Sequence, residues 1–268
     1  MFISNYMKPK KSLGQNFLTS VPARMAIVAA GNITPTDTIL EIGPGKGFLT
    51  RALLDTGAHV VALEKDSDLI PVLSETFKEE LEKGQLILIE GDVLTFDPQT
   101  HNLTPGSYKL IANIPYYITG AIISRFLAEV ASPSCMVVLI QKEVAERACA
   151  KDGKESLLSL SIQAYGEPKV VYRVSRGSFN PIPNVDSAVL QISNISKNRF
   201  DNEYHESMFF KVIHAGFAHK RKLLASNLKQ VFPGTDFATL FEEYNVPLKE
   251  RAENINIATW IKIAKRLC

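Results

Sequence analysis

Cysteines, clustered histidines and long apolar runs are scarce in this chain of 268 residues. Its three cysteines, Cys135, Cys149 and Cys268, are odd in number and widely spaced. This pattern favours inert thiols in a reducing cytosol over a disulfide framework. The five histidines form no H-E-x-x-H motif, so we expect no metal ion. Because no run of about 18 apolar residues occurs and the first residues lack an apolar signal core, we expect a cytoplasmic protein without a membrane span.

Acidic residues are missing from two long stretches, although the net charge of the whole chain is only +2. None occurs before Asp37, and none occurs from residue 207 to 235. The second stretch contains the basic run Lys220-Arg221-Lys222. A single basic block is usually a solvated face, but two blocks in separate parts of the chain suit phosphates held on both sides of a site. We therefore predict a polyanionic substrate and RNA-phosphate contacts by these three residues.

Apolar, β-branched runs recur along the first two thirds of the chain. They cover residues 38–42, 59–64, 86–90, 109–114 and 135–140, with amphipathic stretches between them. Continuous apolar runs are typical of strands buried on both faces of a parallel sheet. Two further runs at 168–175 and 187–193 are joined by a Pro-rich loop, and we expect an antiparallel pair at the sheet edge. The pattern predicts an α/β fold with a mostly parallel seven-stranded sheet.

The character of the chain changes to helical beyond Asn194. Four helical stretches follow, separated by Pro, Gly and polar breaks, as is typical of helix boundaries. A chain of this length, of which 46% is hydrophobic, can bury a large core and still add a small domain. We predict a boundary near residue 195, with the sheet in domain 1–195 and a small all-helical domain at 196–268.

A glycine-rich loop, Glu41-Ile42-Gly43-Pro44-Gly45-Lys46-Gly47, follows the first predicted strand. Glycines at alternate positions allow a sharp turn and a close backbone approach to a ligand at the mouth of a parallel sheet. A dinucleotide fingerprint needs its third Gly where this chain has Phe48, and a P-loop needs Ser or Thr where it has Gly47. The remaining pattern, E-x-G-x-G-x-G, resembles the loop that holds S-adenosylmethionine (SAM) in class I methyltransferases, so Gly43 and Gly45 are candidate cofactor contacts.

Two acidic residues stand at the ends of later strands. Glu64 ends the second apolar run, where a carboxylate can bind both ribose hydroxyls of an adenosine. Asp92 follows the third run and can accept from the adenine amino group of the cofactor, with Val93 against its ring. Taken singly, each acid is as well explained as a helix cap or a solvated strand end. Their position with Gly43 at successive strand ends predicts one ligand site.

The tetrapeptide Asn113-Ile114-Pro115-Tyr116 follows the fourth run and suits the chemistry of a planar amine, which is a poor nucleophile. The amide carbonyl of Asn113, helped by the backbone carbonyl of Ile114, can accept hydrogen bonds from such an amine. Tyr116 offers a flat face for a base and a π cloud beside a cation, and Pro115 stiffens the loop. In isolation the tetrapeptide would be better explained as a polar turn; beside the glycine loop it makes Asn113 and Tyr116 candidate catalytic residues.

Six ordered motifs resemble those of the ribosomal small-subunit RNA adenine N6,N6-dimethyltransferase family (KsgA type). They are Gln15-Asn16-Phe17-Leu18, the glycine loop, Glu64, Gly91-Asp92-Val93, Asn113-Ile114-Pro115-Tyr116 and F-N-P-I-P-N-V-D-S at 179–187, and the resemblance extends through Arg251-Ala252-Glu253-Asn254. It implies a Rossmann-like class I SAM-dependent methyltransferase with a helical RNA-recognition domain. It also implies a cytoplasmic, usually monomeric enzyme that uses SAM to dimethylate two adjacent adenosines in the 3′-terminal hairpin loop of 16S rRNA, within the small ribosomal subunit during its assembly.

The resemblance implies roles for the residues that match these motifs. Gln15, Asn16 and Leu18 would contact SAM from an N-terminal segment that folds over it as a lid. The other cofactor ligands would be Gly43, Gly45, Glu64, Asp92, Val93 and Asn113. Phe179 would stack on the target adenine opposite Tyr116, although a Phe beside two prolines is more often a packed loop anchor.

Three alternatives stay open at this point. A 23S rRNA adenine N6-methyltransferase of the macrolide-resistance type shares N-I-P-Y, but the G-P-G loop and the R-A-E-N segment favour the small subunit. A non-catalytic nucleic-acid-binding assembly factor would not need Asn113, Tyr116 and Glu64, which are all present. Methylation of a protein glutamine usually accompanies Asn-Pro-Pro-Tyr, from which Ile114 departs.

Overall fold

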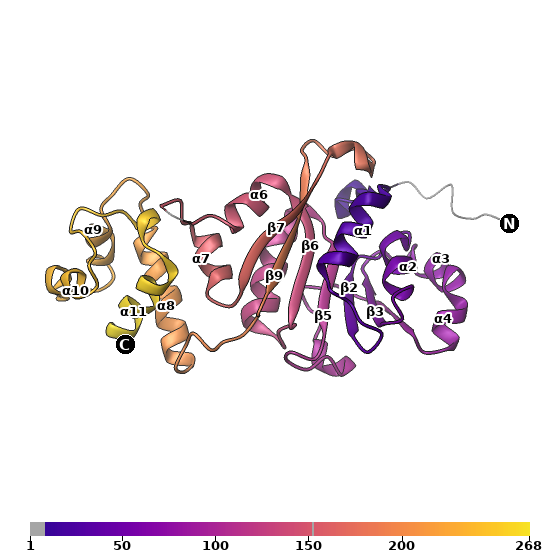
Figure 1. The fold of residues 1–268 in the computed structure, drawn as a ribbon, viewed down its shortest axis with the longest axis horizontal. Coiled ribbons are helices and arrows are strands. Elements are labelled where there is room, and N and C mark those ends of the chain that lie inside the picture. Colours follow the sequence, from indigo (N-terminus) through magenta and orange to yellow (C-terminus); the bar gives the residue numbers. More distant parts are fainter. Residues whose placement is uncertain (1–8, 152) are drawn as a thin grey trace. The chain divides into compact units, whose positions relative to one another are not determined.

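The computed structural model describes residues 9–151 and 153–268, which form two compact units (Figure 1). Unit 1 holds the described residues up to Ala145 and the stretch Glu167–Ile195, and unit 2 holds those of Glu146–Gly166 and Ser196–Cys268. The domain boundary at residue 195 stays a prediction, because the chain also changes unit after residues 145 and 166. Within the described ranges, no helix is long and apolar enough to cross a membrane.

Unit 1 is built on the seven-stranded sheet that the apolar runs predict. Its strands lie in the order β4-β3-β2-β5-β6-β9-β7. All neighbouring pairs from β4 to β6 are parallel, whereas β9 is antiparallel to both β6 and β7. The bounds are β2 Thr38–Ile42, β3 His59–Glu64, β4 Leu86–Glu90, β5 Lys109–Asn113, β6 Cys135–Gln141, β7 Glu167–Val174 and β9 Ser187–Ser193. The mostly parallel sheet and its antiparallel edge pair are confirmed.

The strand order reverses between β2 and β5, because β3 continues the sheet on one side of β2 and β5 begins the other side. In open α/β sheets, ligands bind outside the carboxyl ends of the strands at such a reversal. The glycine loop leaves β2 and the N-I-P-Y tetrapeptide leaves β5. The topology therefore brings the two most informative motifs of the sequence to one place.

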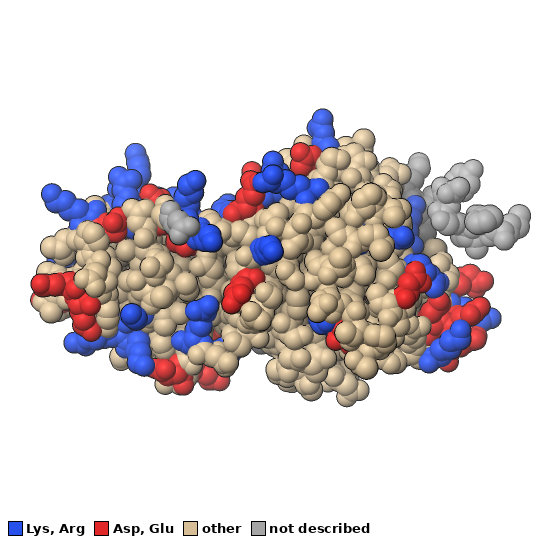
Figure 2. All heavy atoms as spheres, viewed as in Figure 1, with Lys and Arg blue, Asp and Glu red and all other residues tan. Residues whose placement is uncertain are grey.

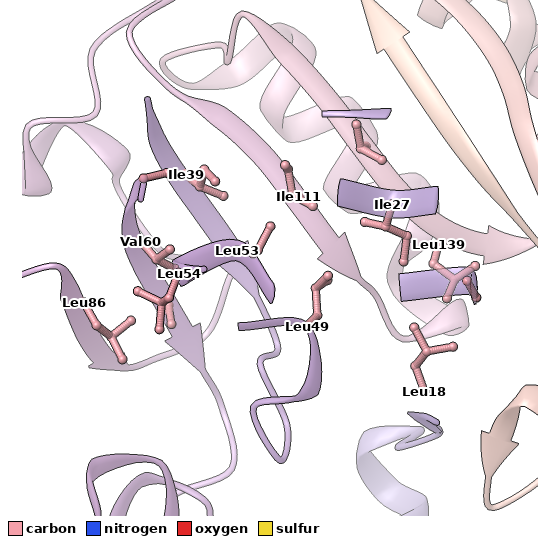
Figure 3. Close-up of a cluster of buried hydrophobic side chains, with 14 of the residues drawn as sticks. Leu18, Ile27, Ile39, Leu49, Leu53, Leu54, Val60, Leu86, Ile111 and Leu139 are labelled. Carbon is pink, nitrogen blue, oxygen red and sulfur yellow. The ribbon is translucent and has the colours of Figure 1, made fainter. Parts of the chain in front are cut away.

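Short helices pack apolar side chains against the sheet of unit 1 and form a hydrophobic core with it. They are α1 Val21–Ala30, α2 Phe48–Leu54, α3 Ile70–Thr76, α4 Lys78–Glu82 and α5 Thr119–Ser124, with a π-helical turn at Arg125–Glu129, and α6 Lys142–Ala148 runs on into unit 2. Ser20 caps α1 by accepting a hydrogen bond from the Ala23 N–H, as Ser commonly does. Figure 3 shows Ile27 of α1 and Leu53 of α2 beside Ile111 of β5, in one buried cluster. Burial of these apolar side chains holds the sheet and its loops in place.

Unit 2 is helical, as the sequence predicts beyond residue 195. Its helices are α7 Leu157–Gln163, α8 Glu203–Gly216, α9 Leu224–Leu228, α10 Phe237–Glu243 and α11 Ile257–Arg266. Phe209 of α8 and Trp260 of α11 are fully buried in it. The Tyr165 hydroxyl donates to Oε1 of Glu206 over 2.6 Å. This bond ties the segment that carries α7 to α8, a long-range contact that no local pattern predicts.

Gly216→Ala tests the close packing of α8 on α11. A methyl group at Gly216 would lie 2.3 Å from Cη2 of Trp260, so we expect the free energy of unfolding of unit 2 to fall by about 1–3 kcal/mol. Trp260 is the single tryptophan of the chain, so its fluorescence during urea unfolding reports on this unit. Gly120→Ala in α5 is the matched control, because no atom lies within 4 Å of its added methyl group. An unchanged midpoint for Gly216→Ala would contradict this close packing.

Candidate active site

A cavity of about 430 Å³ opens at the carboxyl ends of β2, β3, β4 and β5 in unit 1. Its size lies in the range of small-molecule sites. The predicted site residues that line it are Gln15, Asn16, Leu18, Gly43, Gly45, Glu64, Asp92, Val93, Asn113 and Tyr116. Residues far apart in the sequence thus share one cavity, while their individual roles stay predictions.

The glycine loop forms part of the cavity wall in a conformation that favours glycine. The φ angles of Gly43, Gly45 and Gly47 are +66°, +60° and +81°, in the left-handed region. A methyl group at Gly45 would lie 3.0 Å from the ring of Phe17, whereas nothing lies within 4 Å of one at Gly43. A ligand can therefore approach the Gly43 backbone closely, and the Phe17 ring covers the loop beside it. Phe17 belongs to the Gln15–Leu18 motif, but nothing in the sequence predicts that its ring lies against the glycine loop.

Glu64 ends β3 with a carboxylate that is 5% exposed. Its Oε2 accepts from the Gly45 N–H at 3.0 Å, and its Oε1 accepts from the Asp66 N–H at 2.8 Å. Burial raises the pKa of Glu64, and these two hydrogen bonds act in the opposite direction. Each carboxylate oxygen can accept a second hydrogen bond. The geometry therefore suits a ligand that offers two hydroxyl groups, as a ribose does.

Glu41 is a second buried acid in the cavity wall, and sequence reasoning gave it no role. Its side chain is 1% exposed, and its Oε2 atom has no hydrogen-bond partner among the described residues. Burial, and to a smaller extent the Glu64 carboxylate, raises the pKa of Glu41 to about 8. An unpaired buried oxygen is costly, so this atom fits a ligand that brings a donor. The only signal in the sequence is its place as the first residue of E-x-G-x-G-x-G.

Asp92 lies at the cavity and is already engaged by protein groups. Its Oδ1 accepts from the Leu94 N–H at 3.0 Å, and its Oδ2 pairs with Nζ of Lys65 at 2.7 Å. The Lys65 contact is the largest cause of a pKa of Asp92 below its usual value. The carboxylate is therefore charged, and it holds the Lys65 ammonium group beside the site. Lys65 also lines the cavity, a placement that the sequence did not predict.

The N-terminal segment 10–19 is bound to two other parts of unit 1. Nζ of Lys10 donates to the buried carboxylate of Asp66 at 2.5 Å, and Nε2 of Gln15 donates to it at 2.7 Å. Farther along, β1 Phe17–Leu18 pairs with β8 Phe179–Asn180. Gln15 also accepts from the Lys10 N–H through Oε1. Both ends of the Gln15 amide thus bind protein groups, so its visible function is to hold the segment at the cavity.

Asn113 ends β5 with its amide oriented by the N-terminal segment. Its Nδ2 donates to the backbone carbonyl of Asn16 at 3.1 Å. Because a carbonyl can only accept a hydrogen bond, the Asn16 carbonyl fixes the orientation of the Asn113 amide, with Nδ2 toward Asn16. Oδ1 of Asn113 is left to accept from a ligand in the cavity. The arrangement suits the orientation of an amine.

Tyr116 is half-buried in the short 3-10 turn that follows Asn113. Its hydroxyl lies 2.6 Å from Oγ of Ser187, a fully buried residue at the start of β9. Burial raises the pKa of Tyr116, so the phenol is neutral at pH 7. The contact holds one end of the ring, and Ser187 is therefore a positioning residue that sequence reasoning missed. The sequence shows Ser187 at the end of the N-V-D-S motif, but it does not show that Tyr116 is its hydrogen-bond partner.

Phe179 is not brought into the cavity with the other predicted residues. It is 3% exposed and belongs to the hydrophobic core, whereas its neighbour Asn180 lines the cavity. Successive residues of a strand point to opposite faces, and β8 directs Phe179 to the core. Stacking of Phe179 on the target adenine opposite Tyr116 stays a prediction.

Lys220, Arg221 and Lys222 lie in unit 2, in the turn between α8 and α9. All three are exposed, and none of them pairs with an acidic residue among the described ones. The buried Asn227 donates from Nδ2 to the carbonyls of Gly216 and His219 at 2.6 and 3.1 Å, which holds the turn against the end of α8. Figure 2 shows basic side chains along the part of unit 2 that carries α9. The run is thus presented to solvent as a cluster of uncompensated positive charge.

Comparisons with known proteins point to one family. The family model described as Ribosomal RNA adenine dimethylase matches residues 6–268. A protein of Dehalococcoides mccartyi named Ribosomal RNA small subunit methyltransferase A is 39% identical over 264 residues, which are 98% of this chain and 88% of that relative. The structure of a dimethyladenosine transferase from Plasmodium falciparum has a TM-score of 0.76 at 25% identity and covers 92% of this chain and 95% of its own. The structure of the 23S rRNA methyltransferase ErmE has a TM-score of 0.77 at 24% identity, covers 94% and 99%, and shows the likeness of fold alone.

Glu64→Ala tests the cofactor site. The variant removes a charged acceptor, and we expect SAM affinity to fall about ten- to a hundredfold, or about 1.5–3 kcal/mol. Glu90→Ala is the matched control, because Glu90 is an exposed acid at the end of the neighbouring strand, in register with Glu64. Calorimetric titration with SAM measures both. Wild-type affinity in a folded Glu64→Ala protein would refute this assignment.

Proposed function

The chain belongs to the ribosomal RNA adenine dimethylase family, and from this we propose that its substrate is the 3′-terminal hairpin loop of 16S rRNA in the small ribosomal subunit. The protein is an enzyme, an rRNA adenine dimethyltransferase, and SAM is its cofactor. We propose that it converts two adjacent adenosines to N6,N6-dimethyladenosine during assembly of the subunit, as a cytoplasmic monomer. The name of the Dehalococcoides relative, which specifies the small subunit, supports this choice.

The cavity fits SAM in several independent respects. The open space at Gly43 admits a close backbone contact, and the Glu64 carboxylate suits a ribose. The unpaired Oε2 of Glu41 suits a ligand that brings a hydrogen-bond donor. Asp92 and Val93 line the same cavity, and we propose that they hold the adenine of the cofactor. SAM, when bound, supplies an electrophilic methyl carbon and a neutral thioether leaving group.

The observation that carries the mechanism is the hydrogen bond from Asn113 to the Asn16 carbonyl. With Nδ2 engaged there, Oδ1 of Asn113 accepts a hydrogen bond from the N6 amine of the adenine. The backbone carbonyl of Ile114 accepts from the same amine, and Tyr116 offers its ring to the base. These contacts orient the nitrogen lone pair toward the methyl carbon, so positioning and electrostatics provide the catalysis.

Proton transfer needs no strong base in this scheme. The N6 nitrogen becomes acidic only as its bond to the methyl carbon forms and the carbon–sulfur bond breaks. The proton then leaves to water or to a nearby carbonyl. Because two methyl groups are added in turn, the pocket must accept both adenine and N6-methyladenine. Extrusion of the base costs least from a single-stranded loop, which supports a hairpin loop as the substrate.

The alternatives are weaker on particular observations. A 23S rRNA substrate would draw on the likeness to ErmE, which shows fold alone, whereas the curated relative is named for the small subunit. A purely binding role leaves the orientation of the Asn113 amide and the burial of Glu64 without a purpose. Incubation with labelled SAM and separately purified, unmethylated small and large subunits decides among them. We expect label on the small subunit alone, in its 3′-terminal loop.

Asn113→Ala tests the chemistry. We expect the rates of both methyl additions to fall about a hundred- to a thousandfold, because one preorganised acceptor is removed. RNA binding should survive, and Tyr116→Phe should keep much of the activity if the ring rather than the hydroxyl matters. Single-turnover assays on unmethylated small subunits, with mono- and dimethyladenosine separated, measure each step. Wild-type rates of dimethylation in a folded Asn113→Ala protein would overturn the mechanism.

Replacement of Lys220, Arg221 and Lys222 by Gln tests the RNA contacts. We expect weaker RNA binding and a flatter plot of log affinity against log salt, with the slope reduced by about one for each phosphate that the variant no longer binds. SAM affinity should stay near normal. The matched control replaces Lys262, Lys265 and Arg266 of α11, since it removes the same charge but two of its members already pair with acids. Equal slopes for the test variant and the wild type would show that the run is a solvated face.

A further inference from the structure

Tyr117 is an aromatic residue left open at the cavity. Its side chain is 61% exposed, and it lines the same cavity as Asn113 and Tyr116. Among the described residues, its hydroxyl has no hydrogen-bond partner, in contrast to the hydroxyl of Tyr116. Burial and a hydrogen bond to Ser187 therefore explain the position of the Tyr116 ring, but neither explains the position of the Tyr117 ring.

The local backbone explains why the two neighbouring rings differ. Tyr116–Ile118 forms a 3-10 turn, in which successive side chains diverge by about 120°. The Tyr116 hydroxyl reaches the buried Ser187, so the Tyr117 ring leaves the turn in another direction and stays in contact with solvent. The turn thus places one ring inside the site and one at its rim.

The N-terminal segment supports the Tyr117 ring. A methyl group at Gly14 would lie 3.1 Å from Cδ1 and 3.2 Å from Cε1 of Tyr117, and Gly14 has a φ of +62°. Glycine at this position lets the backbone approach the ring closely. The ring is therefore held in place by backbone on one part of its surface while most of its area remains open. An open aromatic surface that is backed by the chain in this way is suited to a flat partner.

We propose that Tyr117 stacks on the RNA base next to the target adenosine, while the target adenine itself enters the cavity beside Tyr116. This inference rests on the proposed function, because it takes a single-stranded RNA loop as the substrate. Bases of single-stranded RNA commonly stack on aromatic side chains. Lys46 lines the same cavity with an exposed ammonium group, and its charge suits a phosphate of a strand that passes its mouth.

The test combines variants of Tyr117 with RNA substrates that lack one base next to the target. Removal of one stacking face costs about 1–3 kcal/mol per base, so we expect Tyr117→Ala to lower kcat/KM for the first methyl addition about 5- to 150-fold. Tyr117→Phe keeps the ring and should stay within about twofold of the wild type. Tyr172→Ala is the matched control, because Tyr172 is 39% exposed on the edge strand β7, and its variant should match the wild type.

The same assay is run on small subunits reconstituted with an abasic nucleotide on the 5′ or the 3′ side of the target. We expect the loss of activity caused by Tyr117→Ala to disappear on one of these two substrates, with SAM affinity unchanged. A loss that persists undiminished on both, no loss on the intact loop, or a parallel loss of SAM affinity would each overturn the proposal. Wild-type enzyme that methylates no small subunit would instead refute the proposed function.

Discussion

The hydrogen bond from the Gly45 N–H to the buried Glu64 carboxylate joins two strand ends, and the rest of the site is built outward from it. The other oxygen of Glu64 accepts from Asp66, whose own carboxylate binds the N-terminal segment. That segment in turn supplies the backbone carbonyl that orients the Asn113 amide. One polar network thus runs from the glycine loop to the group that receives the amine. Such networks act as a unit, so cofactor binding and amine orientation depend on the same contacts.

The electrostatics of the cavity follow from its two buried acids. Two adjacent charged carboxylates would be costly in a site of low polarity. The pKa of Glu41 is raised to about 8 by burial, so that carboxyl is mostly protonated at neutral pH. Burial raises the pKa of Glu64 as well, and its hydrogen bonds from the Asp66 and Gly45 N–H groups act against that rise. The two oxygens of Glu64 are thus fixed by backbone groups where a ribose is expected, and the exposed Lys46 lines the same cavity.

Local patterns predicted much of this fold because the inner strands of the sheet are buried on both faces and read as continuous apolar runs. The parallel sheet, its antiparallel edge pair and the helices α8 to α11 of unit 2 follow from such runs and breaks. Strand ends in parallel sheets gather at one edge, and for this reason the sequence alone groups Gly43, Glu64 and Asn113. The placement of residues 146–166 in unit 2 depends on contacts such as that of Tyr165 with Glu206, which leave no local pattern.

The sequence by itself determined the order of the elements, the residues at the strand ends and the resemblance to the dimethyltransferase family. Only the tertiary structure decided which faces those residues present. Phe179 and Asn180 are adjacent in the chain, yet one enters the core and the other the cavity, because a strand alternates its side chains and β1 pairs on one edge of β8. Ser187 beside Tyr116, Lys65 beside Asp92 and the open ring of Tyr117 are likewise products of packing. The direction and the partners of a side chain depend on residues that are distant in the sequence. The sequence therefore indicates the chemistry of the site, whereas the fold sets its geometry.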